Sequence, residues 1–169
     1  LADEVESMKE SMDGLCVISV SYCWEGADHP DPNCSILLDV ADAIVAAQTE
    51  PVRRADGAVC WPLPKEAAIF LDWCSLCQKD EHGKRTSEEN VAFGVALGCM
   101  QVWYAHTSTT SLLMTKPATA GRSYMQRGWP VFERSVSLLG KTSASDCGPP
   151  LIIDAGREGG VAERPMALT

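Results

Sequence analysis

The side chains best suited to chemistry lie between Arg127 and Glu133, where the chain reads Arg-Gly-Trp-Pro-Val-Phe-Glu. Pro130 is typical of the first position of a helix, because its missing N–H costs nothing there and its φ angle is already helical. Glu133 then falls in the first turn, where free backbone N–H groups and the helix dipole favour a carboxylate. Residues four apart share a helix face, so Trp129 and Glu133 are expected to line one pocket.

An acid beside a flat ring is an arrangement that can act on a glycosidic bond. The ring offers a stacking surface, and the carboxylate can stabilise positive charge on a sugar as the bond breaks. The alternative is structural, with Trp129 buried against a sheet and Glu133 only capping its helix. Arg127 is a candidate for clamping a phosphate or for pairing with an acidic neighbour.

Other candidate binding residues lie where apolar, strand-like runs end. Tyr22 and Trp24 follow one such run, and binding groups concentrate in loops of this kind. Asp72 ends another run, where an unpaired carboxylate is costly, so we expect it to be hydrogen-bonded to a loop or to face a ligand. Ser75 and Gln78 lie in the following loop, where they could contact a ligand or form hydrogen bonds with the backbone of the loop itself.

The composition of the chain narrows its class. It has 169 residues, 46% of them hydrophobic, which predicts one globular domain. A formal net charge of −9 argues against binding nucleic acid, whose affinity rests largely on Lys and Arg. No apolar run approaches the roughly 20 residues of a membrane span. The chain has eight cysteines but no export signal, which predicts reduced thiols in a cytoplasmic protein and not disulfides. Cys74 and Cys77 have the spacing of zinc ligands, but no second ligand pair follows them, so zinc is not predicted.

Helical and strand-like patterns alternate along the chain. Thr86 and Glu89 have the spacing of a capping box, and the Ser/Thr-rich stretch from Ser108 to Ala120 has no clear pattern. The expected elements are a lead-in helix over 1–14, strands over 15–22, 67–73, 101–105 and 151–154, helices from Ile36 to before Pro51, from Thr86 to about Met100 and from Pro130 to Gly140, and a flexible tail over 156–169.

Short apolar strands alternating with helices predict a doubly wound α/β domain over 15–155. Its parallel sheet, of about four or five strands, is expected to carry helices on both faces. Ligands bind such sheets beyond the carboxyl ends of the strands. The loops after Tyr22, Asp72 and Ala105 are expected at that edge. The chain has no Gly-x-Gly-x-x-Gly and no P-loop, so neither common phosphate-binding motif is indicated.

Three blocks of the sequence resemble a known family in their order and separation. Val20–Gly26 resembles the Leu-Ser-Tyr-x-Trp-Gly segment of fungal heterokaryon-incompatibility (HET) domains, with one extra residue before the glycine. Phe70–Asp80 resembles their Ile-Asp-x-x-Cys-Ile-Asn-Gln-x-Asp segment, with Ser75 and Cys77 in place of Cys and Asn. Arg127–Glu133 is similar to their Arg-x-Trp-x-x-x-Glu and to the Trp-x-x-x-Glu of Toll/interleukin-1 receptor (TIR) domains.

A longer form of the last block, Tyr-x-x-Arg-Gly-Trp-x-x-Phe-Glu from Tyr124 to Glu133, resembles an uncharacterised group of protist proteins related to both families. The resemblance implies a flavodoxin-like, TIR-like fold. Catalytic TIR domains hydrolyse NAD at the nicotinamide glycosidic bond with a glutamate at the position matching Glu133, so NAD would be a substrate here and not a cofactor. Trp129 or Trp24 would stack on a base or, through cation–π attraction, on the pyridinium ring.

Two functions stay open from the sequence. One is a TIR-like domain that binds NAD and hydrolyses it with Glu133, active on self-association as catalytic TIR domains generally are. The other is a non-catalytic signalling or scaffold module of the same fold, which meets itself or other protein domains. Its acidic loops at Asp28–Asp31 and Asp80–Glu81 would then face basic partner surfaces.

Overall fold

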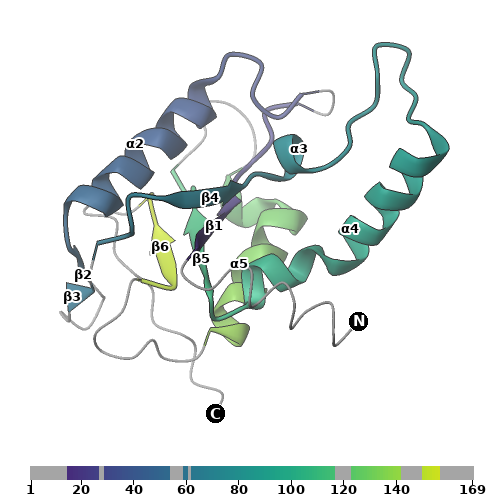
Figure 1. The fold of residues 1–169 in the computed structure, drawn as a ribbon. Helices are drawn as coiled ribbons and strands as arrows, with labels where there is room; N and C mark the ends of the chain where they lie inside the picture. Colours follow the sequence, from purple (N-terminus) through teal and green to yellow (C-terminus); the bar gives the residue numbers. More distant parts are fainter. Residues whose placement is uncertain are drawn as a thin grey trace.

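A computed structural model describes residues 15–26, 29–53, 59–60, 62–116, 123–141 and 150–156 (Figure 1). Four parallel strands form its main sheet, in the order β4 (Ala67–Phe70), β1 (Cys16–Ser21), β5 (Thr109–Leu113) and β6 (Ile152–Asp154). A separate antiparallel pair is formed by β2 (Val52–Arg53) and β3 (Val59–Cys60). The main sheet confirms the expected α/β class.

The helices lie on the two faces of this sheet. Figure 1 shows α2 (Ser35–Thr49) on one side, and α4 (Ser87–Ala105) and α5 (Gly128–Gly140) on the other. Two shorter elements, α3 (Asp72–Ser75) and the 3₁₀ turn η1 (Tyr124–Gln126), precede α4 and α5. The chain moves outward from β1 to β4 and then returns past β1 to β5, which is the doubly wound, flavodoxin-like arrangement. Strand order therefore reverses between β1 and β5, the place where such folds form a ligand crevice.

The face of the sheet under α2 is apolar. Alternate residues of a strand point to opposite faces, and Ile18 and Val20 of β1 belong to one buried cluster with Leu112 of β5. Val40 and Ile44 of α2 pack into the same cluster at helical spacing. This alternation explains why the predicted helix from Ile36 and the first predicted strand both form.

The face under α4 and α5 is lined with hydroxyl groups. Ser19 and Ser21 of β1 and Ser111 of β5 are fully buried there. Ser137 of α5 donates a hydrogen bond of 2.9 Å to the Ser111 hydroxyl, and the Nζ of Lys141 donates to the same oxygen at 2.5 Å. Burial lowers the pKa of Lys141 to about 7. A buried polar layer therefore joins α5 to the centre of the sheet, beside a small apolar cluster in which Leu138 of α5 packs with Leu113 and Ile152.

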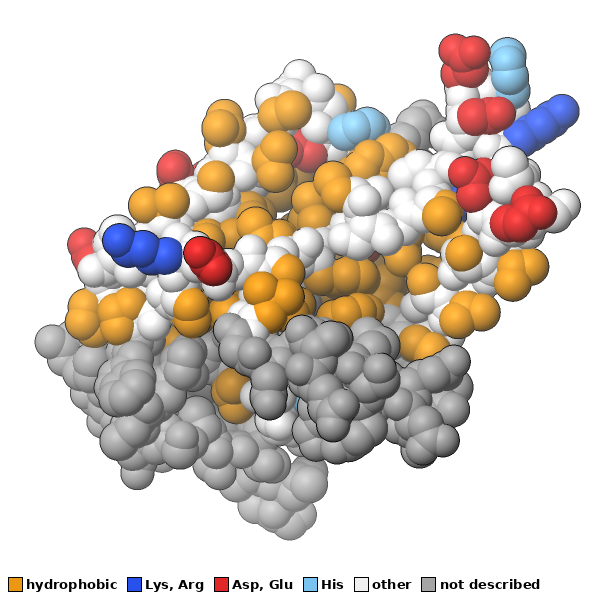
Figure 2. All heavy atoms as spheres, in the orientation of Figure 1, with side chains coloured by type: hydrophobic (Ala, Val, Ile, Leu, Met, Phe, Trp, Pro, Cys, Tyr) orange, Lys and Arg blue, Asp and Glu red, His pale blue; other side chains and the backbone are white. Residues whose placement is uncertain are grey.

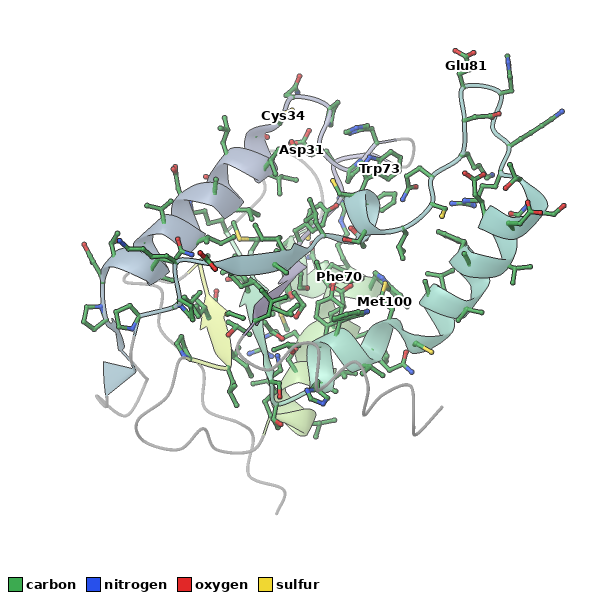
Figure 3. All side chains as sticks on the ribbon, in the orientation of Figure 1. Asp31, Cys34, Phe70, Trp73, Glu81 and Met100 are labelled. Carbon is green, nitrogen blue, oxygen red and sulfur yellow. The ribbon has the colours of Figure 1, made fainter. Side chains whose placement is uncertain are left out.

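The prediction of a strand over 101–105 is wrong, because α4 continues to Ala105. Met100 and Tyr104 lie one helical turn apart and both pack with Phe70 of β4 in one buried cluster. Figure 3 shows Phe70 and Met100 side by side between the sheet and the helix. No Gly or Pro lies between Met100 and Ala105, so the helix that the capping box at Thr86 opens continues through this stretch to a length of 19 residues.

The central strand β5 comes instead from the Ser/Thr-rich stretch that had no clear pattern. All five residues of Thr109–Leu113 are buried. The three that carry hydroxyls can be buried because each hydroxyl has a partner; the Thr110 hydroxyl, for example, donates to the Pro150 carbonyl at 2.8 Å. The loop after Ala105 consequently enters β5 at the amino edge of the sheet. It does not reach the ligand edge where it was expected.

Some sequence predictions fall on other parts of the chain. The lead-in helix over 1–14 and most of the tail, residues 157–169, lie outside the described residues. Among the helices that the structure describes, none has the length and apolar character needed to cross a bilayer.

The contact between α4 and α5 leads to a prediction about two helical glycines. A Cβ at Gly140 would lie 2.6 Å from the Ala105 carbonyl oxygen, whereas a Cβ at Gly98 would meet nothing within 4 Å. Gly140→Ala should therefore lower the free energy of unfolding by about 1–3 kcal/mol through overpacking. Gly98→Ala should raise it by about 0.5–1 kcal/mol because alanine loses less backbone entropy in a helix.

Urea denaturation of both variants beside the parent measures these changes. Gly98→Ala is the matched control, since it makes the same chemical change on an exposed helix face. Equal effects of the two substitutions would contradict the close approach of α5 to α4.

Candidate functional site

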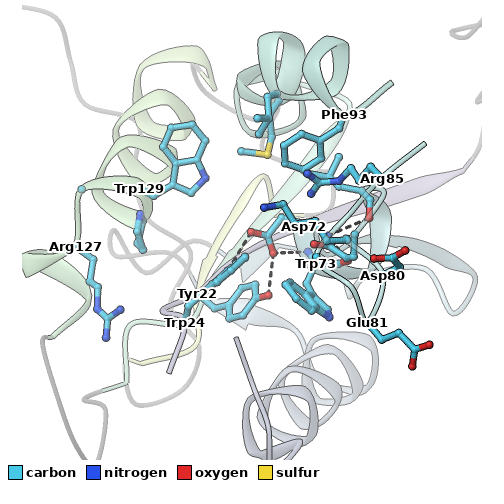
Figure 4. Close-up of a pocket in the computed structure, with 18 residues that line it drawn as sticks. Tyr22, Trp24, Asp72, Trp73, Asp80, Glu81, Arg85, Phe93, Arg127 and Trp129 are labelled. Carbon is cyan, nitrogen blue, oxygen red and sulfur yellow. Dashed lines mark hydrogen bonds between the residues drawn. The ribbon is translucent and has the colours of Figure 1, made fainter. Parts of the chain in front are cut away.

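A half-open cavity of about 980 Å³ lies at the carboxyl ends of β1 and β4 (Figure 4). Its walls come from four segments: Tyr22 and Trp24 after β1, residues between Asp72 and Arg85 after β4, one side of α4, and Arg127–Pro130 at the start of α5. In Figure 2 charged side chains gather over residues 79–89 at the upper right, and hydrophobic side chains fill the hollow at the centre of the face. The cavity thus joins sequence blocks that are far apart in the chain.

Asp72 holds two of the predicted binding residues in place. It is 7% exposed, and its carboxylate accepts hydrogen bonds from the Tyr22 hydroxyl at 2.8 Å and from the Trp24 indole at 3.2 Å. The backbone N–H of Trp73 donates to it at 2.7 Å. Burial, with the Asp72 charge and hydrogen bond, raises the pKa of Tyr22, so its hydroxyl stays a donor. Of the two expected roles of Asp72, the structure shows the hydrogen-bonded one.

Aromatic rings form much of the wall that Asp72 organises. The indoles of Trp24 and Trp73 meet edge to face with centroids 5.3 Å apart, and the His29 imidazole lies 5.0 Å from the Trp73 ring. The imidazole Nδ1 of His29 accepts a hydrogen bond from the Asp31 backbone at 3.0 Å. These contacts fix the Trp24 ring as a rigid surface at the mouth of the cavity.

Trp129 lies across the cavity from that surface (Figure 4). Its side chain is 48% exposed, so the alternative of a Trp buried against the sheet is wrong. It stacks on Phe132 with centroids 5.5 Å apart and an interplanar angle of 20°. Arg127 also lines the cavity. Its Nε is buried, and no described residue accepts a hydrogen bond from it.

Ser75 and Gln78 serve the local backbone. The Ser75 hydroxyl is exposed and accepts a hydrogen bond from the Leu71 N–H at 3.2 Å, and Ser75 does not line the cavity. The Gln78 amide does line it, but its Nε2 donates to the carbonyls of Trp73 and Leu76 at 2.8 and 3.0 Å. Of the two, only Gln78 lines the cavity.

Glu133 lies one layer below the cavity and is not part of its lining. It is 3% exposed, and the Ser21 hydroxyl donates to its Oε2 at 2.6 Å. The Tyr124 hydroxyl is 2.6 Å from the Ser21 oxygen; because the Ser21 proton is directed to Glu133, Tyr124 is the donor in that pair. A chain of hydroxyls thus runs from η1 through β1 to the carboxyl group.

Burial raises the pKa of Glu133 to about 8, and the charge of Asp72 adds to this effect. Hydrogen bonds from Ser21 and Tyr104 act in the opposite direction. Glu133 is therefore mostly protonated at neutral pH. Desolvation of a carboxyl group in a site with few compensating charges has this effect in general.

The expectation that Glu133 occupies the first turn of its helix is wrong. The helix begins at Gly128, two residues before Pro130, and Glu133 is its sixth residue. The helix dipole acts mainly on the first turn, so it does not account for the position of this carboxyl group. The hydrogen bond that Ser21 of β1 donates to Glu133 accounts for it.

Several cavity residues were not candidates in the sequence. They are Trp73, Arg85 and Phe93, together with Ser21 and Tyr124 beneath. One signal was present for Ser21: it repeats Ser19 at the period of two that marks one face of a strand. Nothing in the spacing of Arg85 and Phe93 distinguishes them from an ordinary pair on a helix start.

Comparisons with models of protein families, with curated proteins and with solved structures found no match. The family relationship and the NAD chemistry implied by the three sequence blocks therefore stay predictions.

The raised pKa of Glu133 makes the stability of the fold depend on pH. Between its ordinary pKa of 4.5 and its folded value of about 8, the native state keeps a proton that the unfolded chain releases. This contribution to stability is complete below pH 4.5 and is lost as the pH rises through 8. The free energy of unfolding should fall by about 1.4 kcal/mol per pH unit within that range.

Urea denaturation of the parent and of Glu133→Gln between pH 5.5 and 7.5 isolates this term. Lys141 titrates in both proteins, so its effect cancels in the difference. The variant should gain stability relative to the parent as the pH rises. A difference that does not change with pH would show that Glu133 titrates near its ordinary value.

Proposed function

We propose that this chain binds a nucleotide of the NAD class in the cavity at the ends of β1 and β4. The observation that carries the proposal is the pair of aromatic surfaces across that cavity. Trp24 is fixed by Asp72 on one side, and the half-exposed ring of Trp129 lies on the other. Flat rings bind between such surfaces by stacking, and a pyridinium ring adds cation–π attraction.

The size and position of the cavity support the proposal. A volume of about 980 Å³ is at the upper end of the range for small-molecule sites, which suits a dinucleotide better than a single base. The cavity also opens at the carboxyl edge of a doubly wound sheet, beside the reversal of strand order between β1 and β5. Nucleotides commonly bind in that position.

The chemistry that we propose for a bound NAD is hydrolysis assisted by Glu133. The bond between ribose C1′ and the nicotinamide nitrogen breaks, and its electron pair leaves with neutral nicotinamide. Water then adds to C1′ and loses a proton, which gives ADP-ribose. An ionised Glu133 would stabilise the positive ribose during this step.

Two properties of Glu133 oppose this chemistry in the conformation described. The carboxyl group is buried and does not line the cavity, whose wall includes Arg127–Pro130 at the start of α5, and its pKa of about 8 keeps it largely protonated. Hydrolysis therefore requires the segment from Arg127 to Pro130 to move, and we propose that ligand binding or self-association supplies that movement.

The same two properties favour a second candidate, a non-catalytic module. An exposed apolar row on α4, formed by Val91, Val95 and Val102, is consistent with contact to another protein domain. In this alternative Glu133 is only a structural member of the buried polar layer.

Binding is tested by calorimetric titration with NAD. Trp129→Ala should weaken the affinity for NAD by roughly 10-fold or more, since stacking on one aromatic side chain contributes about 1–3 kcal/mol. Leu38→Ala, which truncates an exposed side chain on α2 away from the cavity, should leave the affinity unchanged. Equal affinities of the parent and Trp129→Ala would count against the proposed site.

Catalysis is tested by following nicotinamide release from NAD, with the protein in dilute solution and clustered on beads. Release should increase with pH towards 8 as Glu133 ionises, and Glu133→Ala should lower it roughly 100-fold or more. If the clustered parent releases no nicotinamide, or if the variant matches the parent, the hydrolase proposal fails. Binding would then stand alone as the function.

A further inference from the structure

Arg85 is held in a fixed position in the wall of the cavity. Its Nε donates a hydrogen bond of 2.6 Å to the Cys77 carbonyl, and its guanidinium carbon lies 3.6 Å from the centroid of the Phe93 ring. Figure 4 shows the guanidinium extending beneath Phe93 towards the interior of the cavity. Both contacts use the inner part of the guanidinium. The two terminal nitrogens, with their four N–H groups, are left for another partner.

The carboxylates that share the cavity with Arg85 are engaged elsewhere. Asp72 accepts three hydrogen bonds from its own neighbourhood. The Oδ1 of Asp80 accepts two backbone N–H groups of the following turn, at 2.9 and 2.7 Å. Glu81 is strongly exposed at the tip of that turn, 3.7 Å from His82 (Figure 3). Within the described residues, Arg85 forms no ion pair with any of them.

The chain carries 23 acidic side chains and only 14 Lys and Arg, yet none of the three described acids of the cavity pairs with Arg85. A guanidinium that is immobilised by a carbonyl and a ring, and left without a counter-ion inside a cavity, has little entropy left to lose on binding an anion. Its flat fork also matches two oxygens of a phosphate group.

We propose that Arg85 is the phosphate-binding residue of this cavity, and that the ligand class is therefore a phosphorylated nucleotide and not a free nucleoside or base. The proposal rests on the proposed function for the ring of the ligand, whereas the phosphate contact can be measured without a ring. Arg85 lies on the α4 side of the cavity and Trp129 on the α5 side, so ring and phosphate would bind to different walls (Figure 4).

The experiment is a calorimetric titration of the parent and Arg85→Gln with three probes: NAD, nicotinamide riboside and inorganic pyrophosphate. Nicotinamide riboside has the same pyridinium ring and ribose as NAD but no phosphate. Arg85→Gln should weaken NAD and pyrophosphate by roughly 10- to 100-fold, the effect of losing a hydrogen bond to a charged group. The affinity of Arg85→Gln for nicotinamide riboside should stay within about 2-fold of the parent's, because the substitution is on the wall away from Trp129, where the ring is proposed to bind.

Lys84→Gln is the matched control. It makes the same change of charge one residue away, but Lys84 does not line the cavity, so binding of all three probes should be unchanged. Arg85→Lys keeps the charge without the flat fork, and its affinity for NAD should fall between those of the parent and Arg85→Gln. Urea denaturation of each variant shows whether it is folded.

The outcomes separate the two proposals. Loss of nicotinamide riboside binding together with NAD binding in Arg85→Gln would overturn the role of Arg85, because it would mean a general distortion of the cavity. Equal NAD affinity in Arg85→Gln and the parent, or a parent that binds neither NAD nor pyrophosphate, would also overturn it. If pyrophosphate binds through Arg85 but nicotinamide riboside does not bind, Arg85 is upheld and the proposed ring site fails.

Discussion

The structure depends on the different chemical character of the two faces of β1. Ile18 and Val20 pack against α2, whereas Ser19 and Ser21 face α4 and α5. A strand must place alternate residues on opposite faces, so the central strand is apolar on one side and hydroxylic on the other. Every polar group that α5 brings to the sheet needs a partner, because an unpaired buried polar group is costly. The serines supply those partners, and the position of Glu133 follows from them.

The polar layer avoids buried charge by shifting the pKa values of its two ionisable members in opposite directions. Burial raises the pKa of Glu133 to about 8 and lowers that of Lys141 to about 7. Near neutral pH the carboxyl group is mostly protonated, and the Lys141 side chain is neutral about half of the time. Both can then hydrogen-bond to serine hydroxyls without the large desolvation penalty of an ion. Chemistry at Glu133 would therefore need a change of solvation as well as access.

The helices and strands that could be predicted are those whose local sequence pattern matches the way they pack in the fold. The capping box of Thr86 and Glu89, the apolar spacing of α2 and the buried run of β1 are all of this kind. The strand β5 could not be found in this way, because its hydroxyl side chains read as a loop until their buried partners are known. The run over 101–105 was ambiguous for the opposite reason: a short apolar stretch fits a strand or the end of a helix equally well.

For the candidate site, the sequence located the residues better than their roles. Tyr22, Trp24 and Asp72, expected at strand ends, and Trp129, expected at a helix start, all line one cavity. The depth of Glu133 was not predictable, because it depends on where α5 begins and on a serine whose side chain faces it from another element. Arg85 was missed because the features that mark it, a carbonyl and a ring that hold its guanidinium in the cavity wall, are properties of its surroundings and not of its spacing.

The hydrogen bonds of Asp72 also join the segments that follow β4 and β1. The strand β4 lies at one edge of the main sheet and, within the described residues, pairs with β1 alone, so its ladder is open on its other side. Asp72 follows β4 and accepts hydrogen bonds from Tyr22 and Trp24, which follow β1. These side chains extend the contact between the two strands beyond their last backbone hydrogen bond. A molecule bound against Trp24 would stabilise these hydrogen bonds between the two segments. Occupancy of the cavity and the cohesion of the sheet edge are thus thermodynamically linked.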